Sequence, residues 1–196
     1  MGLWQGGFVM SVATKRGDRG RTDLYLGRRV PKDHPRVEVF GSLDELCAFL
    51  GFVRSLLKDR ETGELIATIQ RELFIIGAEV GVTPGNVRKL QRRIGKSHVD
   101  RLDEELARFE KDADFEACCF YLPGENMLAC SLDIARTVAR RTERRMVALK
   151  NKGMIRNPHI LAYLNRLSDL LFVLSRYYEP VSRKLAYEQA PSRRTK

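Results

Sequence analysis

Residues 160–174 read ILAYLNRLSDLLFVL and decide the fold class of this chain. Their large apolar side chains recur in alternating steps of four and three residues, at Ile160, Leu164, Leu167, Leu171 and Leu174. This spacing follows the period of about 3.6 residues of an α-helix, so the side chains form one stripe along one face. A helix buries such a stripe against its neighbours. The stretch therefore predicts a helix that packs in a bundle.

Four other segments carry the same period. Their apolar positions lie within residues 43–57, 66–80, 99–109 and 128–149. Five stripes in 196 residues predict an all-α, up-and-down five-helix bundle that forms a single domain. We expect this domain to cover residues 14–180, after a disordered start over residues 1–13 and before a polar, basic tail over residues 181–196.

Short motifs mark the expected ends of these helices. Ser42, with Glu45 three residues later, has the spacing of a capping box and predicts the start of the first helix. Ser97 is expected to cap the third helix. Breaks before the fourth and fifth helices are predicted at Pro123-Gly124 and Asn157-Pro158. The first 40 residues carry no stripe, and their glycines predict an extended or hairpin-like segment.

The composition is that of a soluble globular protein, with 43% hydrophobic and 31% charged residues. No run approaches the roughly 20 apolar residues of a membrane span. The four cysteines form no CxxC pair and have no metal-ligand spacing with the three histidines, so we expect reduced thiols, no metal site and a cytoplasmic location. Met10 is an alternative start to Met1. The net charge of +10 suits a polyanion: a nucleic acid, a membrane surface or a nucleoside triphosphate.

A glycine-rich segment, TKRGDRGRT at residues 14–22, is the first candidate for a binding site. Glycines let backbone N–H groups approach an anion, hydroxyls donate to phosphate oxygens, and cations neutralise their charge. The spacing is not that of a P-loop, and a solvated basic turn remains the alternative. The candidate residues are Thr14, Lys15, Gly17, Asp18, Gly20 and Thr22.

The fourth helical segment carries a second candidate, formed by Arg136, Arg140, Glu143 and Arg144. These positions fall within about 100° of arc beside the apolar stripe. Three arginines against one glutamate leave excess positive charge, which favours an acidic partner such as a carboxylate or a triphosphate. The alternative is an exposed face held together by pairs at i,i+4.

A third candidate joins Asn165 and Asp169, one turn apart in the fifth segment. Their side chains either satisfy each other or, with Asp44, orient a ligand at one end of the bundle.

Seven sequence blocks taken in order resemble the PduO-type ATP:cob(I)alamin adenosyltransferases, from Thr14 to about Arg176. The blocks are Thr14–Thr22; Arg29-Val30 with Lys32-Asp33, Arg36-Val37-Glu38 and Gly41; Asp44-Glu45-Leu46; Ile69-Gln70 with Leu73-Phe74; Leu122-Pro123-Gly124; Ala135–Arg145; and Tyr163–Asp169.

The resemblance implies an enzyme that transfers the 5′-deoxyadenosyl group of ATP, held with Mg²⁺, to the reduced cobalt of a corrinoid. It also implies a five-helix bundle assembled as a homotrimer, with three active sites at the subunit interfaces. A corrinoid reductase and adenosylcobalamin-dependent enzymes would then be partners, while nucleic acid and membranes would not.

Individual roles follow from the same resemblance. The glycine segment, with Lys32, would wrap the triphosphate, and Asp44 would pair with Arg136 across the subunit interface. Phe120 stands where the family has an aromatic residue that displaces the lower axial base from cobalt. The residues that would hold the nucleotide from the helical side are Arg136, Arg140, Glu143, Arg144 and Asn165.

The chain departs from the family pattern at two positions and by one extra residue between the arginine cluster and Asn165. Cys47 stands where a small polar residue is common, and Glu125 replaces the second glycine after Leu122-Pro123-Gly124. Two other functions stay open. A nucleic-acid-binding protein would show a continuous basic face with interleaved aromatics, whereas the cations here are spread over the chain. A family member that binds ATP or corrinoid as a carrier or regulator would share the binding residues without turnover.

Overall fold

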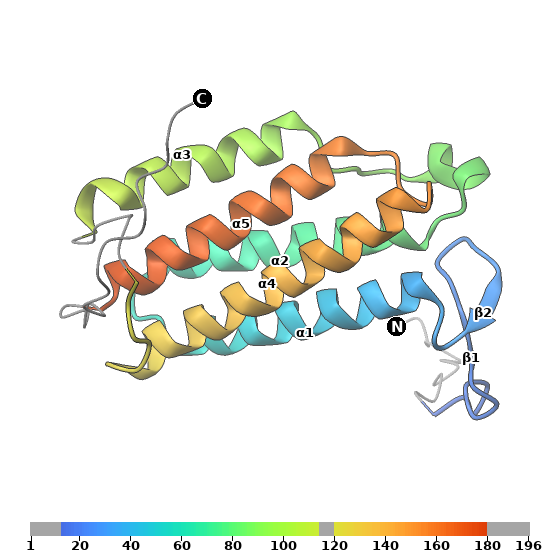
Figure 1. Ribbon diagram of the computed structural model, residues 1–196, viewed down its shortest axis with the longest axis horizontal. Coiled ribbons are helices and arrows are strands. Elements are labelled where there is room, and N and C mark those ends of the chain that lie inside the picture. The colour runs from blue at the N-terminus through green and yellow to red at the C-terminus, as the bar shows by residue number, and fades with distance from the viewer. Residues whose placement is uncertain (1–12, 114–119, 180–196) are drawn as a thin grey trace, which may run out of the picture.

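The computed structural model describes residues 13–113 and 120–179 (Figure 1). Its five long helices are α1 Pro35–Leu56, α2 Arg60–Gly81, α3 Lys96–Asp112, α4 Met127–Asn151 and α5 Pro158–Tyr177. The smaller elements are strands β1 Arg21–Asp23 and β2 Arg29–Pro31 and the 3-10 helix η1 Pro84–Lys89. Figure 1 shows the long helices lying alongside one another, with the β1–β2 hairpin at one end of the bundle. The predicted five-helix bundle is confirmed.

The predicted stripes form the core. All five positions of the α5 stripe are completely buried. In α2 the stripe positions Ile66, Ile69, Ile76 and Val80 are completely buried, and Leu73 is only 2% exposed. Helix α5 packs against α3 and α4, and α1 packs against α2 and α4. Burying each such leucine or isoleucine contributes about 1.5 to 3 kcal/mol, so the packing of these faces stabilises the bundle more than helix propensity does.

The start of α1 differs from the prediction. The helix begins at Pro35, where the fixed φ of proline suits the first turn, and the Nδ1 atom of His34 accepts a hydrogen bond from the backbone N–H of Arg36 at 3.2 Å. Ser42 lies inside the helix, where its hydroxyl donates to the carbonyl oxygen of Glu38 at 3.0 Å. About two helical turns, for which the sequence predicted an extended segment, are therefore part of α1.

The start of α3 also differs. Gly95, and not Ser97, is the N-cap residue, and its backbone N–H donates to Nδ1 of His98 at 3.1 Å. The sequence at residues 83–96 is basic and predicts a solvated loop, but this stretch contains η1 and buries Ile94. The buried carboxylate of Glu79 holds this stretch in place by accepting from the backbone N–H of Ile94 at 2.7 Å and from Arg93 Nε at 3.0 Å.

The start of α5 was predicted correctly at Asn157-Pro158. The side-chain oxygen of Asn157 accepts from the backbone N–H of His159 at 3.0 Å and caps the helix. Its amide nitrogen donates to Glu79 at 3.0 Å, so the same residue fastens the start of α5 to the end of α2.

The hairpin expected in the N-terminal segment is present. Strands β1 and β2 pair antiparallel, with Thr22 opposite Val30. Gly20 has a φ of +70°, a conformation that favours glycine, and its carbonyl oxygen accepts from the backbone N–H of Lys32 at 2.8 Å. This bond fixes the glycine segment beside the first residue after β2.

Within the described residues, no helix is both long and apolar enough to cross a membrane. The expectations for the chain ends, a disordered start over residues 1–13 and a basic tail over residues 181–196, fall almost entirely outside the described residues. The proposed domain limits stay predictions.

Candidate functional site

A pocket of about 450 Å³ opens between α3, α4 and α5, and we call it the arginine pocket. Arg136 and Arg140 from α4 line it together with Arg166 and Asp169 from α5. Its remaining lining residues are Leu106, Glu110, Ser168, Phe172 and Val173. The two α4 arginines that the sequence placed on one strip therefore border the same hollow.

The arginines of this pocket differ in their partners. Arg136 donates through Nε to Oδ1 of Asp133 at 2.8 Å, and Arg166 forms salt bridges with Asp103 and, at 3.1 Å, with Asp169. Arg140 is exposed and forms no salt bridge with any residue that the structure describes. A guanidinium without a carboxylate partner beside a polar hollow is suited to bind an anionic ligand.

The structure does not bring the other predicted helical residues into this pocket. Arg144 and Asn165 are exposed, Glu143 is half-buried, and none of them lines the hollow. Of the two alternatives for Asn165 and Asp169, a contact with each other or with a ligand, the first is not found among the described residues, where Asp169 instead accepts from Arg166 at 3.1 Å. Roles for these three residues in nucleotide binding stay predictions.

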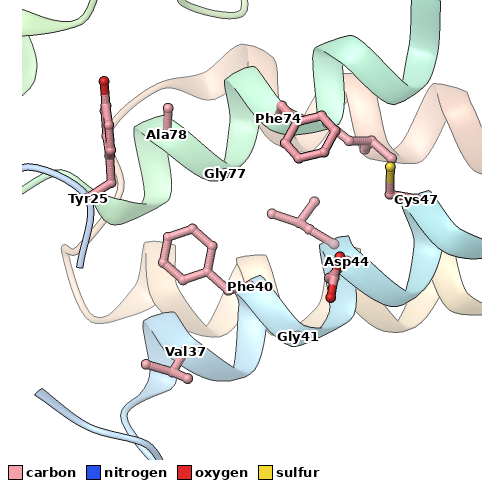
Figure 2. A pocket seen from close by; sticks show the side chains of 11 residues that line it. Tyr25, Val37, Phe40, Gly41, Asp44, Cys47, Phe74, Gly77 and Ala78 are labelled. Atoms are coloured by element: carbon pink, nitrogen blue, oxygen red, sulfur yellow. The ribbon is translucent and has the colours of Figure 1, made fainter. Parts of the chain in front are cut away.

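A second hollow, of about 580 Å³, lies between α1 and α2, and we call it the aromatic groove (Figure 2). Phe40 from α1, Phe74 from α2 and Tyr25 from the hairpin line it, and the side chains of Phe74 and Tyr25 are 71% and 57% exposed. Asp44 and Cys47 stand on its α1 wall, as Figure 2 shows. Large exposed aromatic side chains around a hollow mark a surface suited to a ligand or another chain.

Cys47 has a specific environment in this groove. Gln70 donates to the carbonyl oxygen of Cys47 at 2.9 Å and lies 3.8 Å from its sulfur. Partial burial raises the pKa of the Cys47 thiol, and the nearby charge of Asp44 adds to that effect. The thiol is therefore kept protonated near neutral pH, which makes it a poor nucleophile.

The glycine segment lies at the hairpin end of the bundle. A side chain added at Gly17 would come within 3.1 Å of Nζ of Lys32, so the Lys32 ammonium lies directly against the glycine turn. The backbone N–H of Asp18 donates to the carbonyl oxygen of Lys15 at 3.3 Å. The structure thus places Lys32 against Gly17, in the turn that Lys15 and Asp18 close, while the side chains of Thr14, Lys15 and Asp18 are exposed.

Asp44 and Arg136 do not meet within the chain. Asp44 lines the aromatic groove, Arg136 lines the arginine pocket, and the two hollows share no residue. Helices α1 and α4 are instead joined by salt bridges from Arg141 to Glu45 and from Arg145 to Glu38, the latter at 3.0 Å. The pair that the resemblance implies is one between two copies and stays a prediction.

Phe120 lies just before α4 and is 66% exposed. The ring of the next residue, Tyr121, lies 5.4 Å from the guanidinium carbon of Arg176. The sequence did not single out Asp133 or Arg176. The structure pairs Asp133 with Arg136 and places Arg176 against Tyr121, the neighbour of Phe120. A sequence signal for Asp133 existed, because an acid three residues before Arg136 is placed to pair with it on a helix.

Five packed helices with an arginine-lined pocket define a helical-bundle protein suited to a polyanionic ligand. The sequence model of the cobalamin adenosyltransferase family matches residues 12–178. Corrinoid adenosyltransferase PduO of Salmonella typhimurium is 39% identical over 171 residues, which cover 85% of this chain and 49% of that protein. The corrinoid adenosyltransferase of Citrobacter freundii is 33% identical over 169 residues, covering 86% of this chain and 94% of that protein. The chain therefore belongs to the cobalamin adenosyltransferase family.

The chain spans about half the length of the two PduO relatives that it matches. Solved structures agree with the family. A variant PduO-type ATP:corrinoid adenosyltransferase from Lactobacillus reuteri, complexed with cobalamin and ATP, has a TM-score of 0.81 at 29% identity, covering 90% of this chain and 96% of that chain. Another variant from the same organism, complexed with ATP, has a TM-score of 0.80 at 30% identity, covering 91% and 100% of the two chains.

Proposed function

We propose that this chain transfers the 5′-deoxyadenosyl group of ATP to the reduced cobalt of cob(I)alamin or a related corrinoid, giving adenosylcobalamin and triphosphate. The observation that carries the proposal is the arginine pocket, where Arg140 has no carboxylate partner among the described residues and Arg136 lies beside it. A triphosphate is a ligand that such a pair of guanidinium groups would neutralise.

The reaction explains why arginines are needed and a general base is not. The electron pair of the reduced cobalt forms a bond to the 5′ carbon of ATP, and the carbon–oxygen bond to the triphosphate breaks. No proton is abstracted, so the protein contributes by positioning both substrates and by stabilising the negative charge on the leaving triphosphate. The exposed cations Lys15, Lys32 and Arg140 are suited to that task.

Mg²⁺ would enter with ATP as part of the substrate. The described residues hold no cluster of three His, Cys, Asp or Glu side chains placed to bind a metal ion. Mg²⁺ commonly keeps several waters and is bound through substrate phosphates, so the residues present fit an ion carried mainly by the triphosphate. Asp18 is the one acidic residue of the glycine segment at residues 14–22, and its side chain is exposed.

The exposed ring of Phe120 supports a role on the corrinoid side. Removing the lower axial base makes cobalt easier to reduce, and an apolar ring excludes water and polar groups that would replace the base. Phe120 exposes most of its ring and is therefore free to contact a ligand.

We further propose that the active site forms between copies of this chain in a homotrimer. The glycine segment and Asp44 would come from one copy, and Arg136, Arg140, Glu143, Arg144 and Asn165 from the next. The separation of the aromatic groove from the arginine pocket within one chain supports this arrangement, as do the exposed rings of Phe74 and Tyr25. A cytoplasmic location, a corrinoid reductase and an enzyme that uses adenosylcobalamin belong to the same proposal.

The test is an anaerobic assay of the purified chain with Mg-ATP and chemically reduced cobalamin, followed by the light-sensitive absorbance spectrum of adenosylcobalamin. We expect product to form above the rate without enzyme and triphosphate to be released in equal amount. If ATP or cobalamin binds but no product forms, the chain is a carrier or regulator of the same family. If neither ligand binds, the proposal is wrong.

A further inference from the structure

Asp133 is a buried carboxylate whose two oxygens bind two different arginines. Oδ1 accepts from Nε of Arg136 at 2.8 Å, one turn along α4, and Oδ2 accepts from Nη2 of Arg176 at 2.6 Å, near the end of α5. The side chain of Asp133 is 8% exposed and that of Arg176 only 1%. One carboxylate thus connects a residue of the arginine pocket to a fully buried cation.

Arg176 extends this connection to the segment before α4. Its guanidinium carbon lies 5.4 Å from the centre of the Tyr121 ring and 5.7 Å from that of Phe172, which lines the arginine pocket. It also forms a 2.7 Å ion pair with Glu179, whose side chain is completely buried. A guanidinium within about 6 Å of the faces of two aromatic rings is favourably placed for cation–π attraction.

The same end of α5 holds the residues that follow Tyr121. Asn126, the N-cap residue of α4, donates to the carbonyl oxygen of Tyr178 at 2.8 Å, and the backbone N–H of Glu125 approaches Glu179 Oε1 at 3.4 Å. The segment that begins with Phe120 is therefore anchored to Arg176 and its neighbours at more than one point.

Stabilisation of the bundle is not a sufficient reason for this buried arrangement of charges. A buried ion pair is often no more stabilising than well-packed apolar side chains of similar volume, because removing charges from water costs free energy. What the charges do fix is orientation. Asp133 engages Arg136 through Nε, and the two Nη groups of Arg136, whose side chain is 26% exposed, are left available to other acceptors.

We propose that Asp133 is a positioning residue that joins the two halves of substrate binding: it orients Arg136 toward the triphosphate and, through Arg176, holds the segment carrying Phe120 against the corrinoid. This inference rests on the proposed function. Neutralising Asp133 is expected to weaken ATP binding and to change the state of the bound corrinoid together, although Asp133 touches neither ligand.

The first test compares Asp133→Asn with Glu79→Gln. Glu79 is also a buried carboxylate paired with an arginine, but it lies at the end of α2, outside the arginine pocket and the segment with Phe120. Both variants are expected to unfold at lower temperature. Only Asp133→Asn is expected to bind Mg-ATP about tenfold more weakly in an equilibrium titration. Only Asp133→Asn is also expected to show a smaller base-off fraction in the spectrum of bound cob(II)alamin. Equal binding and equal spectra in the two variants would overturn the inference.

Arg176→Lys supplies a second route if Asp133→Asn does not fold. Lysine keeps the charge but cannot reach Asp133 and Glu179 with separate nitrogens or lay a planar group over the two rings, so the base-off fraction is expected to fall. A wild-type spectrum and wild-type ATP affinity in a folded Arg176→Lys chain would refute the role. These binding measurements need no turnover, so they decide the inference even if the chain forms no adenosylcobalamin. If the wild-type chain binds neither ligand, both proposals fail.

Discussion

The guanidinium of Arg36 donates a hydrogen bond from Nη2 to the carbonyl oxygen of Met154 at 2.8 Å, joining the first turn of α1 to the turn between α4 and α5. Nη1 of the same side chain donates to the carbonyl oxygen of Val80 near the end of α2. Arg36 is 5% exposed, and burial lowers the pKa of its guanidinium. One cation therefore fastens three helix ends where the hairpin enters the bundle.

Replacing Arg36 by alanine is expected to lower the free energy of unfolding by about 2 to 4 kcal/mol, because two buried carbonyl oxygens lose their donor. Urea unfolding followed by circular dichroism measures the change. Arg71→Ala is the matched control, since Arg71 forms an exposed salt bridge with Glu64 and its loss is expected to cost less than about 1 kcal/mol. Equal effects of the two substitutions would contradict the proposed clamp.

Tyr163→Phe is expected to change how stability depends on alkaline pH. The hydroxyl of Tyr163 donates to Oε2 of Glu72 at 2.6 Å, and burial, together with the charge of Glu72, raises the pKa of Tyr163 well above its usual value. Above pH of about 10 the unfolded chain ionises this tyrosine while the folded chain does not, so folding stability falls as pH rises. Below that pH the stabilisation is fully present.

The phenylalanine variant lacks this titration. It is expected to be less stable by about 1 kcal/mol at pH 8, where a hydrogen bond is lost. It is also expected to lose less stability than the wild type between pH 9 and pH 11. Unfolding midpoints measured across that range provide the comparison, and parallel curves for the two proteins would show that Tyr163 does not contribute to the alkaline loss.

Arg140→Ala is expected to lower turnover by about 100-fold or more while the fold stays intact, because the side chain is exposed and would stabilise the leaving triphosphate. The rate of adenosylcobalamin formation and the circular dichroism spectrum are the two measurements. Arg54→Ala, an exposed arginine in the last turn of α1, serves as the control and is expected to keep wild-type activity. Normal turnover in folded Arg140→Ala would remove Arg140 from the proposed site.

Phe120→Ala is expected to leave stability nearly unchanged, since the ring is 66% exposed, but to lower turnover. The cause would be a larger fraction of bound cob(II)alamin that keeps its lower axial base. The absorbance spectrum of the bound corrinoid reports this fraction directly. Phe52→Ala provides a control, because Phe52 is also exposed, at 46%, and lies near the C-terminal end of α1. An unchanged spectrum for Phe120→Ala would count against its role.

Two inactive variants are expected to restore activity when they are produced together, if the site forms between copies. Lys32→Ala damages the hairpin half and Arg140→Ala the pocket half. When copies mix at random, about a quarter of the sites receive both halves intact, so about a quarter of wild-type activity is expected. Equal amounts of each variant purified and assayed alone give the baseline. No recovery in mixed assemblies of confirmed composition would place both halves of the site in one chain.

The bundle could be predicted from the sequence because its signal is periodic and local. The stripe from Ile160 to Leu174 is completely buried, as its spacing indicates. The limits of the helices were harder, since they depend on single hydrogen bonds. His34 caps α1 through a ring nitrogen, and Ser42, which has the spacing of a capping box with Glu45, lies inside the helix instead.

The part of the site that lies on one helix could be predicted from the sequence. Arg136 and Arg140 share a pocket because positions four apart lie on one face. Contacts between distant segments could not be predicted in this way. The pairing of Asp133 with Arg176, 43 residues away, depends on how α4 packs against α5. The spacing of charges within a helix does not reveal that geometry.

The separation of the aromatic groove from the arginine pocket has a kinetic consequence. If each site needs surfaces from two chains, specific activity would not be constant with enzyme concentration but would decline as dilution drives assemblies apart. The apparent reaction order in protein would then exceed one at low concentration. A newly synthesised monomer would have no activity before it assembles with other copies. Reduced cobalt, which reacts readily with oxidants, would then be bound in a complete site only by the assembled oligomer.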